Sequence, residues 1–505
     1  MSSPPASPGL SRRRRQLVLA ICCLSLFIVS LDNTVLQIAL PTLQRDLRAP
    51  LSGLQWTIDA YTLVLASLYI LAGSLADRIG RRRVFMTGLV VFTAGSALCS
   101  LAPTLHTLVA FRMLQAVGGS MLTPVGMSLV THVFPDRHER AHAIGVWGAV
   151  VGLSMAVGPL IGGFLVDSAG WHSIFWLNLP VGLAALVLTR VFVPESRASV
   201  ARRPDPVGQI LVIALLGTLT YTIIQAPDHG WASATTLTLA GLTLALCAAL
   251  AGYELRRDEP LIELRLFKSV PFTGAAINLL IGFGTLGGFL FLTTLYLQNV
   301  RHLSALHAGS WLLPMALMTF LCAPVSGRFV ARYGARPPLL VAGSGITGSG
   351  IVFAAFDGQA QTWSMILGCA LFGLGFGFVN APTTNTAVAG LPVSQAGVAS
   401  SLASTFRQTG TALGVAVIGA VLASGIRPDD YPGSYPDAAH PALWIITGCG
   451  LTILLVGQLT NTRRTPHPAH DTRSVSRNRC EGRTADGAAT APVGIRRVPS
   501  DERRR

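Results

Sequence analysis

The chain has 505 residues, of which 51% are hydrophobic and only 12% are charged, and its mean hydropathy is +0.54. A soluble domain carries about 25% charged residues, so the composition excludes an ordinary soluble protein and indicates a polytopic membrane protein. The net charge is +15, but the arginines gather in loops and tails. Orientation in the membrane accounts for them there, and we expect no nucleic-acid partner.

Fourteen apolar runs are long enough to cross a membrane, because a spanning helix needs about 20 mostly apolar residues. They lie near 16–40, 54–75, 84–102, 107–130, 142–166, 172–193, 207–226, 233–253, 271–297, 306–329, 338–356, 361–384, 395–424 and 441–460. We therefore predict an all-α polytopic membrane protein with fourteen transmembrane helices.

Arginine in the loops sets the predicted orientation, because basic residues accumulate on the cytoplasmic side. The loops after even-numbered spans hold most of them: Arg81–Arg83, Arg137, Arg140, Arg202, Arg203, Arg256, Arg257, Arg332 and Arg336. The chain is then a multi-pass protein of the cytoplasmic membrane with both termini inside the cell.

Spans 1 and 2 each contain an acid. Asp32 lies in the middle of span 1, where a carboxylate must face a cavity or a partner because its charge is costly in hydrocarbon. A partly desolvated aspartate has a raised affinity for protons, as a proton-coupled carrier needs; the alternative is a structural polar contact between spans. Gln37 shares a helical face with Asn33. Asp59 in span 2 is either a second buried acid or a shallow, solvated one.

A charged loop after span 2 recurs after span 10. Gly73–Arg83 reads GSLADRIGRRR and Gly327–Arg336 reads GRFVARYGAR. Arginine, glycine and arginine stand five, seven and nine residues after the first glycine in both loops. Asp77 is replaced by Ala331, so only the first loop can use carboxylate chemistry. Related loops in two halves are typical of transporters built from repeats.

The repeat predicts how the chain is divided. Two extra spans, numbers 7 and 8, must separate two halves of six spans each. The predicted parts are a cytoplasmic tail at 1–15, a six-helix bundle at 16–193, linkers with two extra transmembrane helices at 194–270, a second six-helix bundle at 271–460 and a disordered basic cytoplasmic tail at 461–505.

Span 4 places a cation inside the membrane. Arg112, Gln115 and Gly119 share one face by their spacing. A buried guanidinium needs an anionic partner, for which Asp32 and Asp59 are the candidates. The alternative is that Arg112 only locks helices together.

Span 5 and the C-terminal spans have a different character. Small residues in span 5 recur at steps of three and four and let helices approach closely: Gly145, Gly148, Gly152, Ala156, Pro159 and Gly163. We find no acid within spans 9 to 14, and Arg407 in span 13 stands alone there. The predicted substrate cavity includes Gln37, Gln115, Asn380 and Arg407.

Four of these stretches resemble signatures of one family. Gly73–Arg82 matches G-x-x-x-D-R-x-G-R-R, the signature between spans 2 and 3 of the major facilitator superfamily. Leu31–Pro41 resembles the L-D-x-T-x-x-N-x-A-L-P signature of its fourteen-span drug:proton antiporters and departs from it at Gln37. The stretch from Arg112 resembles the span-4 signature R-x-x-Q-G, with one residue inserted. Gly152–Gly163 is similar to the antiporter signature of exporters.

The resemblance, which covers about Arg12 to Gln458, implies a fold and a function. The fold is two six-helix bundles with two additional central helices. The function is export of drugs or antibiotic-like natural products by alternating access, driven by the proton gradient with no other cofactor, which confers resistance. We expect a monomer in the lipid bilayer that exchanges protons for an apolar substrate, neutral or weakly charged.

The same resemblance implies roles for individual residues. Proton coupling falls to Asp32, Asp59 and Arg112. A conformational gate is formed by Gly73, Asp77, Arg78, Gly80, Arg81 and Arg82, in which Asp77 helps to hold the cytoplasmic side shut against a helix end of the opposite half. The antiporter helix is marked by Gly152, Gly158, Pro159, Gly162 and Gly163.

Two other function classes are weighed. A proton-coupled exporter of a metabolite, amino acid or siderophore fits the same pattern. A membrane-embedded enzyme would need a nucleophile, metal or phosphate-binding motif, and the sequence has no H-E-x-x-H, G-x-S-x-G, Walker or Cys/His cluster. Its eight cysteines show no metal-ligand or disulfide spacing. We therefore predict a transporter without a metal site.

Overall fold

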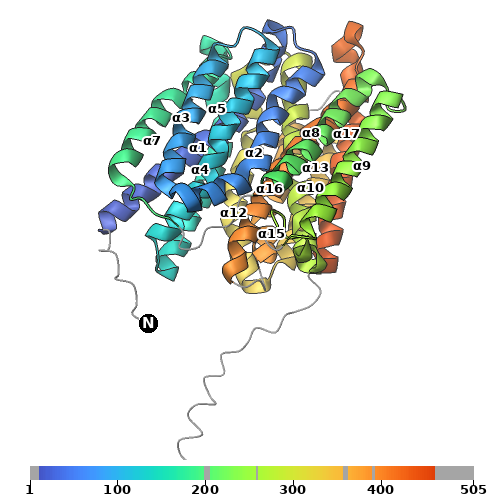
Figure 1. Ribbon diagram of the computed structural model, residues 1–505. Helices are drawn as coiled ribbons and strands as arrows, with labels where there is room; N and C mark the ends of the chain where they lie inside the picture. Colours follow the sequence, from blue (N-terminus) through green and yellow to red (C-terminus); the bar gives the residue numbers. More distant parts are fainter. Residues whose placement is uncertain (1–10, 198–204, 258–259, 356–361, 389–392, 461–505) are drawn as a thin grey trace, which may run out of the picture. The chain divides into compact units, whose positions relative to one another are not determined.

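The computed structural model describes residues 11–197, 205–257, 260–355, 362–388 and 393–460, and its helices are shown in Figure 1. The predicted tail at 461–505 lies outside the described residues. Fourteen helices in the described part are long and apolar enough to cross a membrane, which confirms the predicted number.

The first seven helices form the N-terminal half. They are α1 (Arg12–Asp46), α2 (Leu51–Ile79), α3 (Arg81–Ser100), α4 (Leu105–Val133), α5 (Arg137–Ala169), the single turn α6 (Ser173–Trp176) and α7 (Asn178–Phe192). Helix α4 packs against α2 and α3, and α1 packs against α5. Two residues set helix boundaries in this half. Gly80 ends α2 with a φ of +124°, a conformation that favours glycine, and the side chain of Thr104 caps the N-terminus of α4.

Two helices, α8 (Pro206–His229) and α9 (Ala234–Glu254), follow as a pair. Asp205 begins α8 by accepting a hydrogen bond from the backbone N–H of Gly208 at 3.0 Å. Helix α8 also packs on α2 and on α16 of the C-terminal half. Gln209 anchors it there, because its Nε2 donates to the carbonyl of Ser67 at 2.6 Å. The extra pair is thus attached at the junction of the two halves.

The described residues of the C-terminal half form eight α-helices. They are α10 (Val270–Leu295), α11 (Ala305–Trp311), α12 (Leu313–Tyr333), α13 (Arg336–Ala354), α14 (Thr362–Gly377), α15 (Asn380–Val388), α16 (Val393–Gly425) and α17 (Tyr431–Thr460), with a π-helical turn at Tyr296–Val300 and 3-10 turns at Leu264–Lys268 and Pro428–Asp430. Helix α10 packs closely on α16, and α13 on α17. Glycines permit this: a Cβ at Gly414 would lie 1.9 Å from the carbonyl oxygen of Gly284.

Three predicted boundaries differ from the structure. The run at 306–329 is two helices, since α11 ends at Trp311 and the spanning helix begins at Leu313. Span 12 is broken between α14 and α15, where Gly377 precedes and Pro382 follows the break. Span 14 begins at Tyr431 rather than 441, so it includes Asp437, which sits exposed near its start.

Candidate functional site

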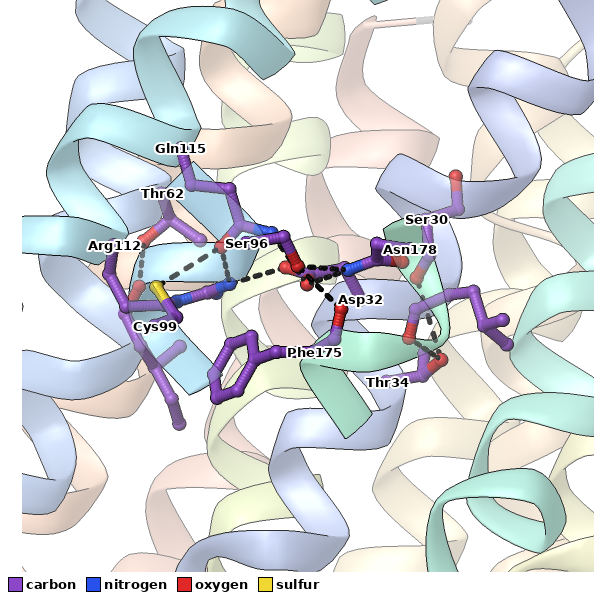
Figure 2. Close-up of polar contacts among 12 residues, drawn as sticks. Ser30, Asp32, Thr34, Thr62, Ser96, Cys99, Arg112, Gln115, Phe175 and Asn178 are labelled. Atoms are coloured by element: carbon purple, nitrogen blue, oxygen red, sulfur yellow. Dashed lines mark hydrogen bonds and ion pairs between the residues drawn. The ribbon is translucent and has the colours of Figure 1, made fainter. Parts of the chain in front are cut away.

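Asp32 and Arg112 form an ion pair in the interior of the N-terminal half. Arg112 Nη1 donates to Asp32 Oδ2, and the two side chains are 0% and 2% exposed. Figure 2 shows the pair between α1 and α4. Of the two candidate anions, the structure selects Asp32 as the partner of Arg112.

Two amides complete the coordination of the Asp32 carboxylate. Its Oδ1 accepts from Gln115 Nε2 at 2.9 Å and from Asn178 Nδ2 at 2.8 Å. Gln115 Oε1 in turn accepts from Arg112 Nη1 at 2.8 Å. Because Arg112 and Gln115 are three residues apart on α4, one helical face delivers both groups to Asp32. The result is a charged pair whose carboxylate also accepts hydrogen bonds from neutral amides. A change in the charge of Asp32 would therefore alter contacts among three helices, α1, α4 and α7.

Aromatic and small polar groups enclose this cluster. The Arg112 guanidinium lies 4.0 Å from the ring centroid of Tyr61, within the range of a cation–π contact. Asn178 Nδ2 also donates to Ser96 Oγ at 3.1 Å, and that hydroxyl donates to the carbonyl of Phe175 at 2.9 Å. Among described residues, Arg112 Nε and Nη2 have no hydrogen-bond partner. The cluster therefore offers fewer acceptors than the guanidinium has donors. The positive charge of Arg112 is compensated mainly by the negative charge of Asp32.

Asp59 is buried and isolated. It is 0% exposed, and neither carboxylate oxygen has a hydrogen-bond partner within the described chain. The structure thus favours the buried acid over the shallow, solvated one in this conformation.

The predicted cavity residues fall into two groups. Gln37 is 5% exposed and Gln115 is 0% exposed, so both are interior, and Gln115 belongs to the Asp32 cluster. Asn380 and Arg407 meet each other: Arg407 Nη1 donates to Asn380 Oδ1 at 3.1 Å, and Arg407 Nη2 donates to Ser404 Oγ at 2.7 Å. Asn380 is exposed and Arg407 partly so.

In the predicted gate loop, Asp77 at the end of α2 forms an ion pair with Arg81 at the start of α3. Its Oδ1 accepts from Arg81 Nη2 at 2.9 Å and Nε at 3.2 Å, whereas Arg78 is exposed. Glu195, which follows α7, binds the other side of the loop by accepting from the backbone N–H of Arg82 at 3.0 Å. A contact of Asp77 with the opposite half stays a prediction, because the side chains at 393–401 are outside the described set.

The first glycine of this loop is not sterically required here. A Cβ at Gly73 would have nothing within 4 Å, whereas one at Gly80 would lie 2.6 Å from Glu195 Oε1. Gly80, and not Gly73, is therefore the position at which the structure demands glycine. Arg82 reaches the carbonyl of Val193 at 3.4 Å, which ties the loop further to the end of α7.

The small residues of α5 serve two contacts. A Cβ at Gly158 would lie 2.0 Å from Thr34 Oγ1 and one at Gly162 3.0 Å from Val35, so these glycines admit α1. Gly163 instead leaves room for α11, since a Cβ there would lie 2.5 Å from Leu306 Cα, and Gly309 on α11 leaves room for the carbonyl oxygen of Pro159, which a Cβ at Gly309 would approach to 2.3 Å. Gly152 approaches only Phe320, at 3.4 Å. The glycine-rich stretch therefore brings the two halves together at one end of α5.

Sequence reasoning did not identify Asp167 at that same end. Its Oδ1 and Oδ2 accept from the backbone N–H groups of Ala305 and Leu306, at 3.0 and 2.9 Å. Ser304 Oγ accepts from the next N–H, that of His307, at 3.4 Å. A carboxylate of the N-terminal half thus satisfies the free donors at the start of α11 in the C-terminal half.

Further contacts join the halves at this end, which the arginine pattern predicts to be the outer one. Gln298 Nε2 donates to the carbonyl of Ile38 at 2.9 Å, and Asn299 Nδ2 donates to Gln44 Oε1 at 3.0 Å. Gln55 Nε2 donates to the carbonyl of Ala416 at 2.9 Å. The halves are closed together at this end. Across the described residues, no group of three His, Cys, Asp or Glu side chains could hold a metal ion.

Known proteins resemble the chain over most of its length. It is 36% identical over 412 residues to "Multidrug resistance protein Stp" of Mycobacterium tuberculosis, covering 82% of this chain and 76% of that protein. It is 38% identical over 443 residues to "Tetracenomycin C resistance and export protein" of Streptomyces glaucescens, covering 86% and 81%. The chain is 31% identical to "Riboflavin transporter RibZ" of Clostridioides difficile, covering 88% of this chain and 97% of that protein.

Solved structures agree on the fold. A bacterial homologue of the human drug peptide transporters PepT1 and PepT2 superposes with a TM-score of 0.60 at 15% identity, covering 88% of this chain and 98% of that one. The profile of the Major Facilitator Superfamily matches residues 22–415. With this match and the relatives above, the chain belongs to the Major Facilitator Superfamily and is a membrane transporter rather than an enzyme.

Proposed function

We propose that this chain exports antibiotic-like small molecules in exchange for protons, by alternating access. The observation that carries the proposal is the buried ion pair of Asp32 and Arg112. A proton on Asp32 would remove the one negative charge that the described residues place beside the guanidinium, and breaking a buried pair in this way costs about 3–5 kcal/mol. Proton binding would therefore weaken the cluster and favour the conformation that releases substrate outward.

Asp59 supports a second proton site. A buried carboxyl group with no partner is stabilised by neutralisation, because an isolated buried charge is very costly. Asp59 lies on α2, which packs against both α4 and α16. A change of its charge would thus act at the contact between the two halves.

The conformational cycle has two candidate gates. At the predicted outer end, the α5 glycines and Asp167 close the halves together. At the predicted cytoplasmic end, the gate would be the loop of Asp77, with Gly73, Arg78, Gly80, Arg81 and Arg82. In this structure Asp77 is engaged by Arg81. We assign the structure to a state closed at the predicted outer end.

The relatives support the substrate class. One is named for multidrug resistance and another for tetracenomycin C resistance and export, and the fourteen-span form and antiporter signature agree with export. We propose a largely apolar substrate that is neutral or weakly charged, held by the amides and aromatic rings between the halves. The relative named as a riboflavin transporter makes a metabolite exporter the second candidate.

The test is transport in everted membrane vesicles from a drug-sensitive host. Asp32→Asn is expected to abolish uptake driven by an imposed pH gradient, while Asp228→Asn, an exposed acid at the end of α8, retains it. Asp32→Glu keeps the charge and separates proton coupling from folding. Full, pH-dependent transport by Asp32→Asn at wild-type expression would remove Asp32 from the mechanism.

A susceptibility panel in the same host tests the substrate class. It should include neutral polyketide-like compounds, dicationic dyes and biguanides. Export of riboflavin is measured separately, as the test of the second candidate. Protection confined to the dicationic compounds would overturn the proposed substrate class.

A further inference from the structure

Arg407 is held by neutral groups from three helices. Its guanidinium donates to Asn380 on α15 and to Ser404 on its own helix α16, and its Cζ lies 5.9 Å from the ring centroid of Phe283 on α10. None of these groups carries a charge. The side chain is therefore fixed in position without being neutralised.

Among the described residues around Arg407, none supplies a counter-charge. Between Val270 and Gly425 the sequence has a single acid, Asp357, which lies outside the described residues at the α13–α14 connection. The ion pairs found in the described chain do not include Arg407. On the facing helix α2, Asp59 contacts no hydrogen-bond donor of the described chain. Arg112, by contrast, has its own carboxylate, so of these two interior arginines only Arg407 is left with an unmatched charge.

The unmatched charge is accessible. Asn380 is exposed, and Arg407 and Phe283 are partly exposed. An arginine within a membrane span faces the bundle interior or a water-filled space rather than lipid, because of the cost of its charge in hydrocarbon. The neighbouring Gln408 on α16 donates to the hydroxyl of Tyr69 on α2 at 3.3 Å, which places this part of α16 at the contact between the halves. The accessible face of Arg407 therefore belongs to the space through which a substrate passes.

Aromatic rings continue from this position into the C-terminal half. Phe283 packs against Phe376 with ring centroids 5.1 Å apart, and Phe376 is stacked with Phe372 at 6.4 Å. Phe372 stacks on Phe289 at 4.1 Å. A planar aromatic compound can pack against the partly exposed Phe283 while one of its oxygens reaches the guanidinium.

We propose that Arg407, with Asn380 and Phe283, binds an ionised acidic oxygen on a planar aromatic substrate, such as an enolate or a phenolate. This inference rests on the proposed export function and narrows its substrate class to weakly acidic aromatic compounds. The planar guanidinium suits the two lone pairs of such an oxygen or a neighbouring carbonyl, and the negative charge of the substrate neutralises the arginine.

The test compares 2-hydroxy-1,4-naphthoquinone, whose enolic hydroxyl is ionised at neutral pH, with its 2-methoxy ether. Binding of each to the purified full-length protein in nanodiscs is measured by calorimetry. One charge-assisted hydrogen bond predicts that the wild type prefers the acid by about tenfold or more. Arg407→Gln is expected to reduce the ratio to about one, and Arg190→Gln, an exposed arginine on α7, to leave it unchanged.

The outcomes separate the two proposals. Equal binding of acid and ether by the wild type, or an unchanged ratio in Arg407→Gln, would overturn the inference. Arg407→Lys keeps the charge and is expected to retain a several-fold preference, so a folded lysine variant without preference would also overturn it, even where the glutamine variant fails to fold. Acid preference without pH-driven transport would refute the proposed export alone, and transport without acid preference would refute this inference alone.

Discussion

Removing the carboxylate of Asp167 should open the outer end of the transporter. Asp167 accepts two backbone N–H groups at the start of α11. Hydrogen bonds to a charged group contribute about 1.5–3 kcal/mol when buried, but Asp167 is exposed, so we take about 1 kcal/mol for each. Asp167→Asn keeps one acceptor oxygen and should shift the closed-to-open ratio about fivefold, and Asp167→Ala, which loses both bonds, about 30-fold.

The measurement is the distance between spin labels at the predicted outer ends of the two halves. Leu101 follows α3 and Asp437 lies near the start of α17, and both are exposed. In a background without native cysteines, the fraction of long distances should rise from the wild type to Asp167→Asn to Asp167→Ala. Asp228→Asn is the control, since it removes an exposed acid of α8. Identical distance distributions in wild type and Asp167→Ala, or an equal shift in Asp228→Asn, would refute the reasoning.

Three further outcomes follow from particular contacts. Gly163→Val should displace the backbone of α11 and abolish transport, while Gly145→Ala, where a Cβ meets nothing within 4 Å, should be silent in the same vesicle assay. Asp77→Asn should impair transport far more than Ala331→Ser, because only the first of the repeated loops has a carboxylate. Equal, mild effects on transport would show that this difference between the two loops has no mechanical role. Gln209→Ala should lower the melting temperature by about 1 °C, because one lost buried hydrogen bond costs about 1 kcal/mol and the unfolding entropy of so long a chain is large; a melting temperature equal to that of the wild type would contradict this.

Much of the fold could be predicted from the sequence, because the membrane imposes a simple rule on length and polarity. A run of about 20 apolar residues is a span whatever it packs against, so the number of spans did not depend on tertiary structure. The ion pair was foreseeable for a related reason: a charge in hydrocarbon needs a partner, and few partners exist. The sequence left two anions for Arg112, and only the packing of α1 against α4 decided for Asp32.

Residues that act across distant elements were missed. Nothing in the sequence around Asn178 indicates that its amide reaches Asp32, 146 positions away. Asp167 gains its role from the N-terminus of a seven-residue helix, which was hidden inside an apolar run. Glu195 looked like part of a charged linker and instead binds the loop at Gly80. Local sequence predicts which groups need partners, but the partner is set by the packing of whole helices.

Helix α8 covers one of the two seams along which the spanning helices of the two halves meet. It packs on α2 and α16 together, so it covers the seam where these helices meet. Its outer surface carries Ile210, 65% exposed, and Ile213, 45% exposed, which suit contact with acyl chains. On the opposite seam, formed by α5 and α12, no spanning helix of the described chain packs on both partners in this way. The two seams therefore present unequal surfaces to the lipid, because a spanning helix lies over α2 and α16, whereas α5 and α12 meet without such a cover among the described helices.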